Sequence, residues 1–342
     1  MTGEEQPQGW SIYSLAQAYE DRPPTEWIVD KFFSSESLNI VYGPPASMKS
    51  MLLADMCAAI AAGRDWLPGC YAGGKGIGTV QSPVFWIDMD NGSRRTHERF
   101  AAVGRAHQLP PNTPLFYTSM PMPPFNANDL DSTLYLVDTI REVQARLVVI
   151  DNLGLITGDV EENSAEMASV MGYLRIIAER THSALIVIHH QRKGGANGGR
   201  QGDALRGHSS IEAAVDLALH VMRDPDTSSL TIRSTKTRGV DVPDTMAQFN
   251  YVHKPNTHDL EKAWFSGMER VRGSNAIREA IVATLAGNVT MTKTRLAEEV
   301  RKTLNGEVGV NSIRAWIDDM LNVSGELTSS KGRDNATVIS LP

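Results

Sequence analysis

The sequence predicts an α/β fold: a mainly parallel sheet covered by helices, followed by a small C-terminal domain. Three observations lead to this prediction. From residue 36 onward, short apolar runs alternate with helical patterns, as parallel strands joined by crossover helices do. After residue 215, segments alternate between apolar and polar residues, which is typical of antiparallel strands. After residue 270, three short helical patterns precede a hairpin.

The first strand and helix flank a turn that contains glycine. Residues 38–42 predict a strand, and residues 50–62 predict a helix that ends at Gly63. Later segments repeat this alternation. Buried strands, apolar on both faces, are expected at residues 84–87, 147–150 and 185–188, and an amphipathic helix over residues 163–181.

Changes in pattern divide the chain into three parts. Residues 1–35 are expected to form an irregular arm with a short helix, broken by Pro23 and Pro24. Residues 36–270 form the main domain, in which an antiparallel meander extends the sheet. Residues 271–342 hold three helical patterns and a hairpin, which predict a small winged-helix domain.

Composition limits the class of protein. Hydrophobic residues make up 41% and charged residues 21% of the 342 residues, which predicts a substantial core. The net charge of −7 argues against a uniformly basic nucleic-acid binder, so local basic patches would have to make any such contact. Two cysteines without metal-ligand spacing favour a reducing cytoplasm. The polar N-terminus and the lack of a long apolar run predict neither a signal peptide nor a membrane span.

The segment VYGPPASMKS, at residues 41–50, predicts a phosphate-binding loop. The usual pattern is Gly, four variable residues, Gly, Lys and then Ser or Thr, and Met48 stands where the second glycine is usual. Backbone N–H groups at the start of the following helix favour a negatively charged ligand. Lys49 is expected to contact the outer phosphates, and the Ser50 hydroxyl to ligate Mg²⁺. An incidental Lys-Ser pair in a turn is the alternative.

The predicted nucleotide-binding residues form one continuous segment. They are Gly43, Pro44, Pro45, Ala46, Ser47, Met48, Lys49, Ser50 and Met51.

Carboxylates follow two of the other predicted strands. Asp151 follows the strand in RLVVIDNL, where it is expected to hold Mg²⁺ through water. Asp88 and Asp90 follow VFWI, where a general base could polarise the attacking water. The alternative for either residue is that it caps the following helix.

Polar and basic residues follow the strand LIVI. His189 and His190 are adjacent and therefore point to opposite faces, and His190 and Gln191 are predicted to sense the γ-phosphate. The glycine-rich segment that follows is basic. Its Arg192, Lys193 and Arg200 are predicted to contact a nucleic-acid backbone, and a solvated loop is the alternative.

Taken together, these motifs resemble the RecA-like core of ring-forming replicative helicases, specifically the RepA-type plasmid and phage group, with DnaB-type helicases as relatives. The resemblance covers roughly residues 25–255. It rests on the segments VYGPPASMKS, WIDMDNGSRRTHERF, RLVVIDNL, VIHHQRK and LRGHSSIEAAVD, in that order.

The resemblance implies roles for further residues. Asp90 takes the position of the family's catalytic Glu, which makes it a departure from the pattern, as Met48 is. His97 and Arg99 match the segment after that Glu. Other cations match residues that act on a neighbouring subunit: Arg206 resembles the arginine finger of RepA-type enzymes, and the Lys-x-Arg pair of DnaB-type rings is matched by Lys236 and Arg238. Ordinary surface charge is the alternative for the last pair.

The resemblance implies a RecA-like P-loop ATPase that uses ATP and Mg²⁺. It also implies a homo-oligomer, expected to be a hexamer, that moves along single-stranded DNA in plasmid or phage replication. A second interpretation is a regulatory ATPase whose oligomerisation ATP controls. In both interpretations the winged helix would bind duplex DNA or a replication protein. The extended meander and the trans-acting cations disfavour a small-molecule kinase.

Overall fold

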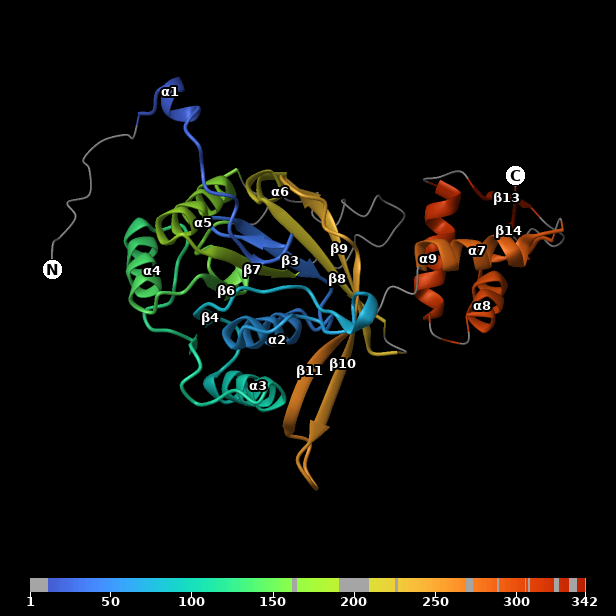
Figure 1. The fold of residues 1–342 in the computed structure, drawn as a ribbon, viewed down its shortest axis with the longest axis horizontal. Helices are drawn as coiled ribbons and strands as arrows, with labels where there is room; N and C mark the ends of the chain where they lie inside the picture. The colour runs from blue at the N-terminus through green and yellow to red at the C-terminus, as the bar shows by residue number, and fades with distance from the viewer. Residues whose placement is uncertain are drawn as a thin grey trace.

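The computed structural model describes most of the chain, namely residues 12–161, 165–190, 209–224, 227–268, 273–287, 289–304, 306, 308–322, 326–331 and 337–341. Within these residues, one large mixed sheet is followed by a smaller C-terminal unit (Figure 1). Some of the predicted site residues lie outside the described residues: Gln191, Arg192, Lys193, Arg200 and Arg206.

In the described part of the chain, nine strands form the large sheet in the order β11-β10-β9-β8-β3-β7-β6-β4-β5. The six strands β8, β3, β7, β6, β4 and β5 are neighbours in this order, and each pair is parallel. This confirms the predicted parallel sheet. The strands predicted from apolar runs are buried along nearly their whole length. The parallel strands are β3 (Leu38–Gly43), β4 (Val84–Asp88), β5 (Leu115–Ser119), β6 (Leu147–Asp151), β7 (Ala184–His190) and β8 (Leu217–Arg223).

An antiparallel meander extends the sheet beyond β8. It consists of β9 (Ser229–Thr237), β10 (Thr245–His253) and β11 (Leu260–Met268), each paired antiparallel with its neighbour. This confirms the predicted meander. Sequence analysis did not identify β11, because Glu261, Lys262 and Gly267 interrupt its apolar alternation.

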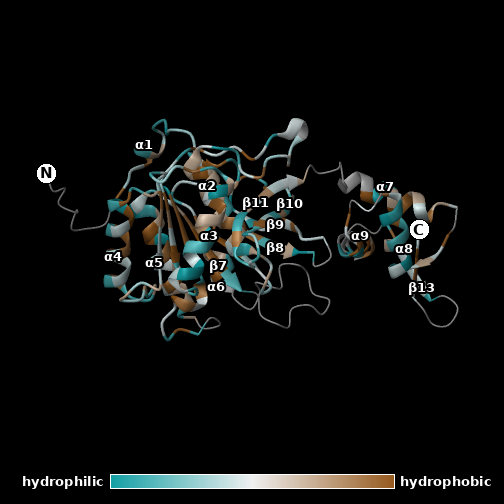
Figure 2. Ribbon diagram, turned by 90° about the horizontal axis from the view of Figure 1, so that it is seen from below, coloured by the Kyte–Doolittle hydropathy of each residue, from teal (hydrophilic) through white to brown (hydrophobic). Residues whose placement is uncertain are grey.

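Helices cover both faces of the sheet. In the view of Figure 1, α5 (Met167–Thr181) and α6 (Ser209–Ala214) lie above it, and α2 (Lys49–Ala62) and α3 (Ser93–Ala106) lie below it. The helix α4 (Leu130–Glu142) packs into the same hydrophobic cluster as α5. Figure 2 shows the hydrophobic residues concentrated on the strands between these helices. No helix in the described ranges is long and apolar enough to cross a membrane.

A buried carboxylate fixes the helix that follows the loop. Asp55 on α2 is 1% exposed, and its Oδ1 lies 2.8 Å from His107 Nε2 at the end of α3. The same oxygen accepts the N–H of Phe265 on β11 at 3.2 Å. Burial raises the pKa of Asp55, and the hydrogen bond with His107 opposes that shift. One side chain therefore ties α2 to α3 and to the edge of the sheet.

The arm expected over residues 1–35 differs from the structure. Strands β1 (Trp27–Val29) and β2 (Phe33–Ser34) pair antiparallel, and Ile28 and Phe33 are fully buried in the core. By contrast, α1 (Leu15–Ala18) has no buried residue. The packed domain therefore begins near β1. Strands this short show no periodicity from which to predict them.

The described residues from 273 onward form a unit with its own apolar core, which includes Ile281, Leu296 and Ile313. Within the described residues, three helices and a three-stranded antiparallel sheet make up this unit. The helices and hairpin are present where they were predicted, and β12 adds a short third strand. The elements are α7 (Gly273–Leu285), β12 (Met291–Thr292), α8 (Lys293–Thr303), α9 (Val310–Asn322), β13 (Thr328–Lys331) and β14 (Thr337–Ser340).

Candidate functional site

The predicted phosphate-binding loop connects β3 to α2 at the carboxyl edge of the parallel strands. In register, Gly43 pairs with His190 on β7, and Tyr42 pairs with His220 on β8. Ligands of open parallel sheets bind outside this edge. The position of the loop therefore agrees with a nucleotide site.

Gly43 is required by close packing. A Cβ atom at this residue would lie 2.2 Å from the carbonyl oxygen of Val221 on β8. Any side chain would therefore push the start of the loop away from β8.

Met48 takes over the backbone conformation of the glycine that it replaces. Its φ of 64° and ψ of 20° lie in the left-handed region, which glycine adopts without strain. For another residue this conformation costs on the order of 1–3 kcal/mol. The Met48 side chain is half-buried and packs against the core beneath α2, and this contact offsets part of that cost.

Lys49 is buried inside the loop, with 3% of its surface exposed. Its Nζ donates to the carbonyl oxygens of Gly43 and Pro44, each at 3.0 Å, and to Ser47 Oγ at 3.2 Å. Burial lowers the pKa of Lys49 to about 8, although the nearby Asp151 carboxylate opposes the shift. A phosphate group could replace these neutral acceptors and bring the ammonium group a full counter-charge.

Two buried carboxylates lie beside each other at the ends of neighbouring strands. Asp88 on β4 and Asp151 on β6 are paired in register and are 0% and 1% exposed. Arg99 from α3 lies between them, because its Nη1 is 3.1 Å from Asp88 Oδ2 and 3.7 Å from Asp151 Oδ2. The Arg99 guanidinium also lies 5.7 Å from the centre of the Trp86 ring. One cation therefore serves two carboxylates.

The carboxylate of Asp88 is occupied by hydrogen bonds at the start of α3. Its Oδ1 accepts the backbone N–H groups of Asp90 at 3.2 Å and Asn91 at 2.8 Å. Its Oδ2 accepts the Thr96 hydroxyl at 2.9 Å in addition to Arg99. The N-cap of α3 is Gly92, without a side-chain cap hydrogen bond, so Asp88 holds the turn before the helix and does not cap the helix itself.

Asp151 Oδ2 lies 3.7 Å from Arg99 Nη1, beyond hydrogen-bond distance. This oxygen is buried and accepts no hydrogen bond from the described residues. Burial raises the pKa of Asp151 to about 6, while a hydrogen bond with Ser50 and the charge of Arg99 lower it. A carboxylate beside a serine hydroxyl fits Mg²⁺, which prefers oxygen ligands. No group of three or more His, Cys, Asp and Glu side chains in the described ranges is suited to a metal, so phosphate oxygens and water would complete the coordination.

The structure places two other predicted residues at the same edge. Asp90 is exposed, and its charge contributes to the raised pKa of Asp151, so it lies within electrostatic reach of the site. His190 is exposed at the end of β7, whereas His189 is buried. The prediction that these two histidines point to opposite faces is confirmed.

Lys236 and Arg238 lie near the amino ends of the parallel strands, at the edge of the sheet opposite the carboxyl edge that carries the loop. Thr237, between them, pairs with Leu217 at the start of β8, and Leu217 pairs with Asn39 on β3. Four residues of β3 separate that level from Gly43, which corresponds to about 13 Å. Both cations contact α6, on the face of the sheet opposite α2. They therefore face away from the predicted phosphate-binding loop.

Sequence analysis missed His220, which borders the loop. Its ring stacks on Tyr42 with a centroid distance of 4.7 Å. Burial, with the charges of Arg233 and Lys49, lowers the pKa of His220 to about 4, so the ring is neutral at pH 7. A polar residue inside the apolar run LALHVM was the available signal.

Comparison with known protein families gives a match over this site. A family model described as "AAA domain" matches residues 12–196, more than half of the chain. The matched range includes the loop, Asp88, Asp151 and His190. It ends before the meander and the C-terminal unit.

The conformation of Met48 leads to a first prediction. Met48→Gly should keep ATP affinity close to wild type, because glycine adopts the same backbone without strain. Met48→Val should weaken affinity about tenfold, since a β-branched residue is strongly disfavoured at positive φ. Titration with a fluorescent ATP analogue measures both variants. Wild-type affinity in Met48→Val would show that this conformation is not needed for binding.

Asp88, at the end of β4, and Asp90, in the turn after it, lead to a second prediction. Asp90→Asn should retain ATP binding and lose about 10²–10⁴ in turnover, the usual contribution of a positioned base. Asp88→Asn should instead lower stability, because Arg99 and the turn lose the charge that holds them. ATP affinity, single-turnover rates and urea unfolding distinguish the variants. A pure rate defect in Asp88→Asn alone would reverse the assignment.

Proposed function

The chain belongs to the AAA domain family of P-loop ATPases, and we propose that it is a ring-forming DNA helicase or translocase of plasmid or phage replication. One observation carries this proposal. Lys49 lies in the predicted phosphate-binding loop and Asp151 at the end of β6, whereas Lys236 and Arg238 contact α6 on the other face of the sheet. A ring, expected to be a hexamer of RepA type, lets the cations of one subunit act on the nucleotide of the next.

The residues of one subunit bind and orient ATP. Lys49 exchanges its contacts within the loop for phosphate oxygens, and the amides at the start of α2 face the same charge. Ser50 and Asp151 hold Mg²⁺, which supplies positive charge to the phosphate oxygens when it is bound. Asp88 and Arg99 fix the turn that carries Asp90.

Asp90 is proposed to orient the attacking water and to accept its proton. Its side chain is one methylene shorter than that of Glu, so the backbone must approach the water more closely. Gly92, which caps α3, has open space where a Cβ would be and permits such an approach. His190, at the end of β7, is proposed to sense the γ-phosphate together with Gln191.

Charge from the neighbouring subunit completes the site. Phosphoryl transfer depends on positioning and charge stabilisation, and an arginine supplied in trans is worth roughly 10³–10⁵ in rate. Lys236, Arg238 and Arg206 are the proposed sources of this charge. Hydrolysis then requires assembly of the ring.

Nucleic-acid contacts are assigned to two parts of the chain. Arg192, Lys193 and Arg200 lie in the sequence between β7 and α6 and are proposed to bind single-stranded DNA. The three helices and three strands among the described residues from 273 onward support a winged helix that binds duplex DNA or a replication protein. The ATPase domain then spans residues 36–270 together with β1 and β2. A regulatory ATPase with the same C-terminal domain is the alternative.

ATP-dependent separation of a forked DNA duplex tests this function. The wild-type protein should hydrolyse ATP, respond to single-stranded DNA and separate the fork. Lys49→Ala should lose both hydrolysis and separation while keeping its circular dichroism spectrum. Lys75→Ala is a matched control, because this lysine is exposed and remote in sequence from the loop.

The outcomes separate the candidate functions. DNA-stimulated hydrolysis without separation of the fork would favour the regulatory ATPase. Wild-type hydrolysis in Lys49→Ala would contradict the nucleotide site itself.

A further inference from the structure

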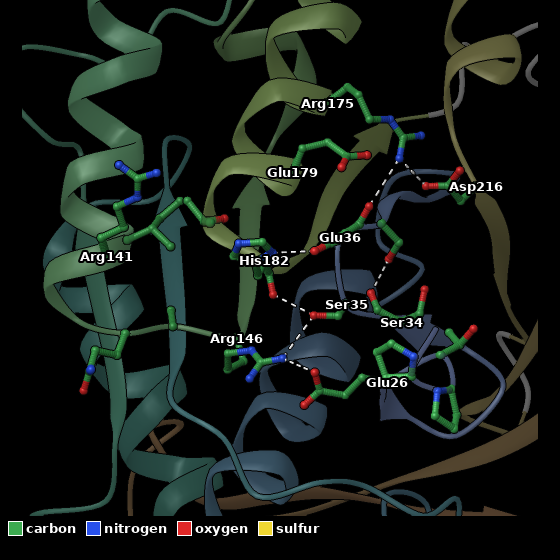
Figure 3. A pocket seen from close by; sticks show the side chains of 18 residues that line it. Glu26, Ser34, Ser35, Glu36, Arg141, Arg146, Arg175, Glu179, His182 and Asp216 are labelled. Carbon is green, nitrogen blue, oxygen red and sulfur yellow. Dashed lines mark hydrogen bonds and ion pairs between the residues drawn. The ribbon is translucent and has the colours of Figure 1, made fainter. Parts of the chain in front are cut away.

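Strand β3, which leads into the loop, is fixed at its amino end by charged side chains. The N–H of Leu38 donates to Asp216 Oδ2 at 2.9 Å, and the same oxygen lies 2.6 Å from Arg175 Nη1. Figure 3 shows Arg175 reaching Asp216 at the border of a cavity of about 940 Å³. Because a strand has a nearly fixed rise per residue, the contacts at the carboxyl end of β3 then decide where the loop begins.

The carboxyl end of β3 is held by β8 through two consecutive residues. The backbone of Gly43 lies so close to β8 that a Cβ atom would be 2.2 Å from the carbonyl oxygen of Val221. Tyr42 is fully buried, and its ring stacks on the ring of His220 with a centroid distance of 4.7 Å and an interplanar angle of 17°. The Tyr42 hydroxyl donates to Thr235 Oγ1 on β9 at 3.0 Å. A backbone contact and a ring stack therefore fix the start of the loop together.

The stack and α2 hold the loop from opposite faces of the sheet. Tyr42 belongs to the hydrophobic cluster that includes α4 and α5, whereas α2 belongs to the cluster on the other face. Met48 packs against that second cluster. The ring of His220 is therefore part of what supports the loop on the face that α2 leaves uncovered.

The position of Tyr42 determines the surroundings of Lys49. Lys49 Nζ donates to the carbonyl oxygens of Gly43 and Pro44, the two residues that follow Tyr42. A shift of Tyr42 would move both acceptors and the amides after them. In the proposed function, Lys49 exchanges these carbonyl oxygens for phosphate oxygens when ATP binds. The loop then loses internal contacts, while the stack on Tyr42 is retained and keeps the backbone in place.

His220 acts in this position as a neutral ring. Burial lowers the pKa of His220 to about 4, and the charges of Arg233 and Lys49 act in the same direction. Arg233 is the neighbour of His220 on β9 and pairs with Asp244 at 3.0 Å. The ring therefore contributes stacking to the loop and no charge to the phosphates.

We propose that His220 is a positioning residue of the nucleotide site, whose ring holds the start of the loop through Tyr42 and thereby sets the affinity for the phosphate groups of ATP. His220 does not touch the nucleotide and acts through Tyr42, Gly43 and the acceptors of Lys49. This inference rests on the proposed function in one respect only, namely that the loop binds nucleotide.

Two substitutions of similar size separate the ring of His220 from its polarity. His220→Phe keeps an aromatic ring, and His220→Gln keeps a polar group without a ring. ATP affinity should fall about three- to tenfold in His220→Gln, the loss expected for one aromatic pair, and stay within about twofold of wild type in His220→Phe. Titration with a fluorescent ATP analogue measures both variants. Wild-type affinity in His220→Gln, or an equal loss in His220→Phe, overturns the positioning role.

Inorganic tripolyphosphate distinguishes a displaced loop from other causes of weak binding. It presents the phosphates to the loop without base or ribose, and it competes with the fluorescent ATP analogue. In His220→Gln its affinity should fall by the same factor as that of ATP, and KM should rise while kcat stays near wild type, because the loop is held in the ground state and the transition state alike. Unchanged tripolyphosphate affinity beside weakened ATP binding contradicts the positioning role, as does a loss confined to kcat.

His253→Gln is the matched control. His253 also contacts a tyrosine ring, that of Tyr251, at a centroid distance of 5.1 Å. It lies at the end of β10, three strands away from β3 in the sheet. Its affinities for ATP and tripolyphosphate should equal those of wild type. A loss like that of His220→Gln would show that the effect is not specific to the loop, and would overturn the positioning role.

A measurement on the wild-type protein covers the case in which His220→Gln fails to fold. Coupling between two sites is reciprocal, so a ligand of the loop should in turn stabilise the strand that carries His220. Tripolyphosphate should slow hydrogen exchange of residues 217–222 by a larger factor than exchange of residues 246–250 on β10. Equal factors for the two strands contradict the positioning role.

The wild-type titrations separate failure of this inference from failure of the proposed function. If the wild-type protein binds neither ATP nor tripolyphosphate, the nucleotide site is wrong and the positioning role falls with it. If the wild-type protein binds both, and His220→Gln binds them equally well, the positioning role alone is wrong.

Discussion

The buried charges at the carboxyl edge of the sheet are the constraint on which the site depends. Lys49, Asp88 and Asp151 are each at most 3% exposed, and the Arg99 side chain is 14% exposed. An unpaired ion in such surroundings costs several kcal/mol. Two cations and two carboxylates must therefore compensate one another, and this requirement fixes the loop, the ends of β4 and β6 and the start of α3 together. The negative phosphates of ATP would meet the Lys49 ammonium group, and Mg²⁺ would meet the Asp151 carboxylate.

The same balance bears on the proposal that neighbouring subunits share the site. Arg99 contacts Asp88 and Asp151, and Lys49 is the cation that the described residues offer to phosphate at this edge. Further cations, at the other edge of the sheet, are held by α6 and Asp216. In the proposed ring, assembly of subunits would bring the two edges together. Hydrolysis in this proposed ring would therefore depend on assembly.

Sequence predicted the parts of the fold that depend on local patterns. Continuous apolar runs predicted β4, β6 and β7, β3 was predicted despite Asn39, and the loop was identified despite Met48. Contacts between distant segments were beyond such reasoning: the stack of His220 on Tyr42 and the bond between Asp55 and Phe265 depend on strand register. The left-handed conformation of Met48 was equally hidden, because Met rarely adopts it. Asp88 and Asp90 became distinguishable only once the hydrogen bonds of the turn were known.

Complementation between two inactive variants tests the central claim most directly, namely that neighbouring subunits share the site. One variant, Lys49→Ala, lacks the proposed nucleotide-binding lysine, and the other, Arg238→Ala, lacks one of the proposed trans-acting cations. Neither should hydrolyse ATP alone, but a mixture should regain turnover, because some interfaces then combine an intact loop with an intact Arg238. Absence of turnover in a mixture that native mass spectrometry shows to contain mixed oligomers would contradict a shared site.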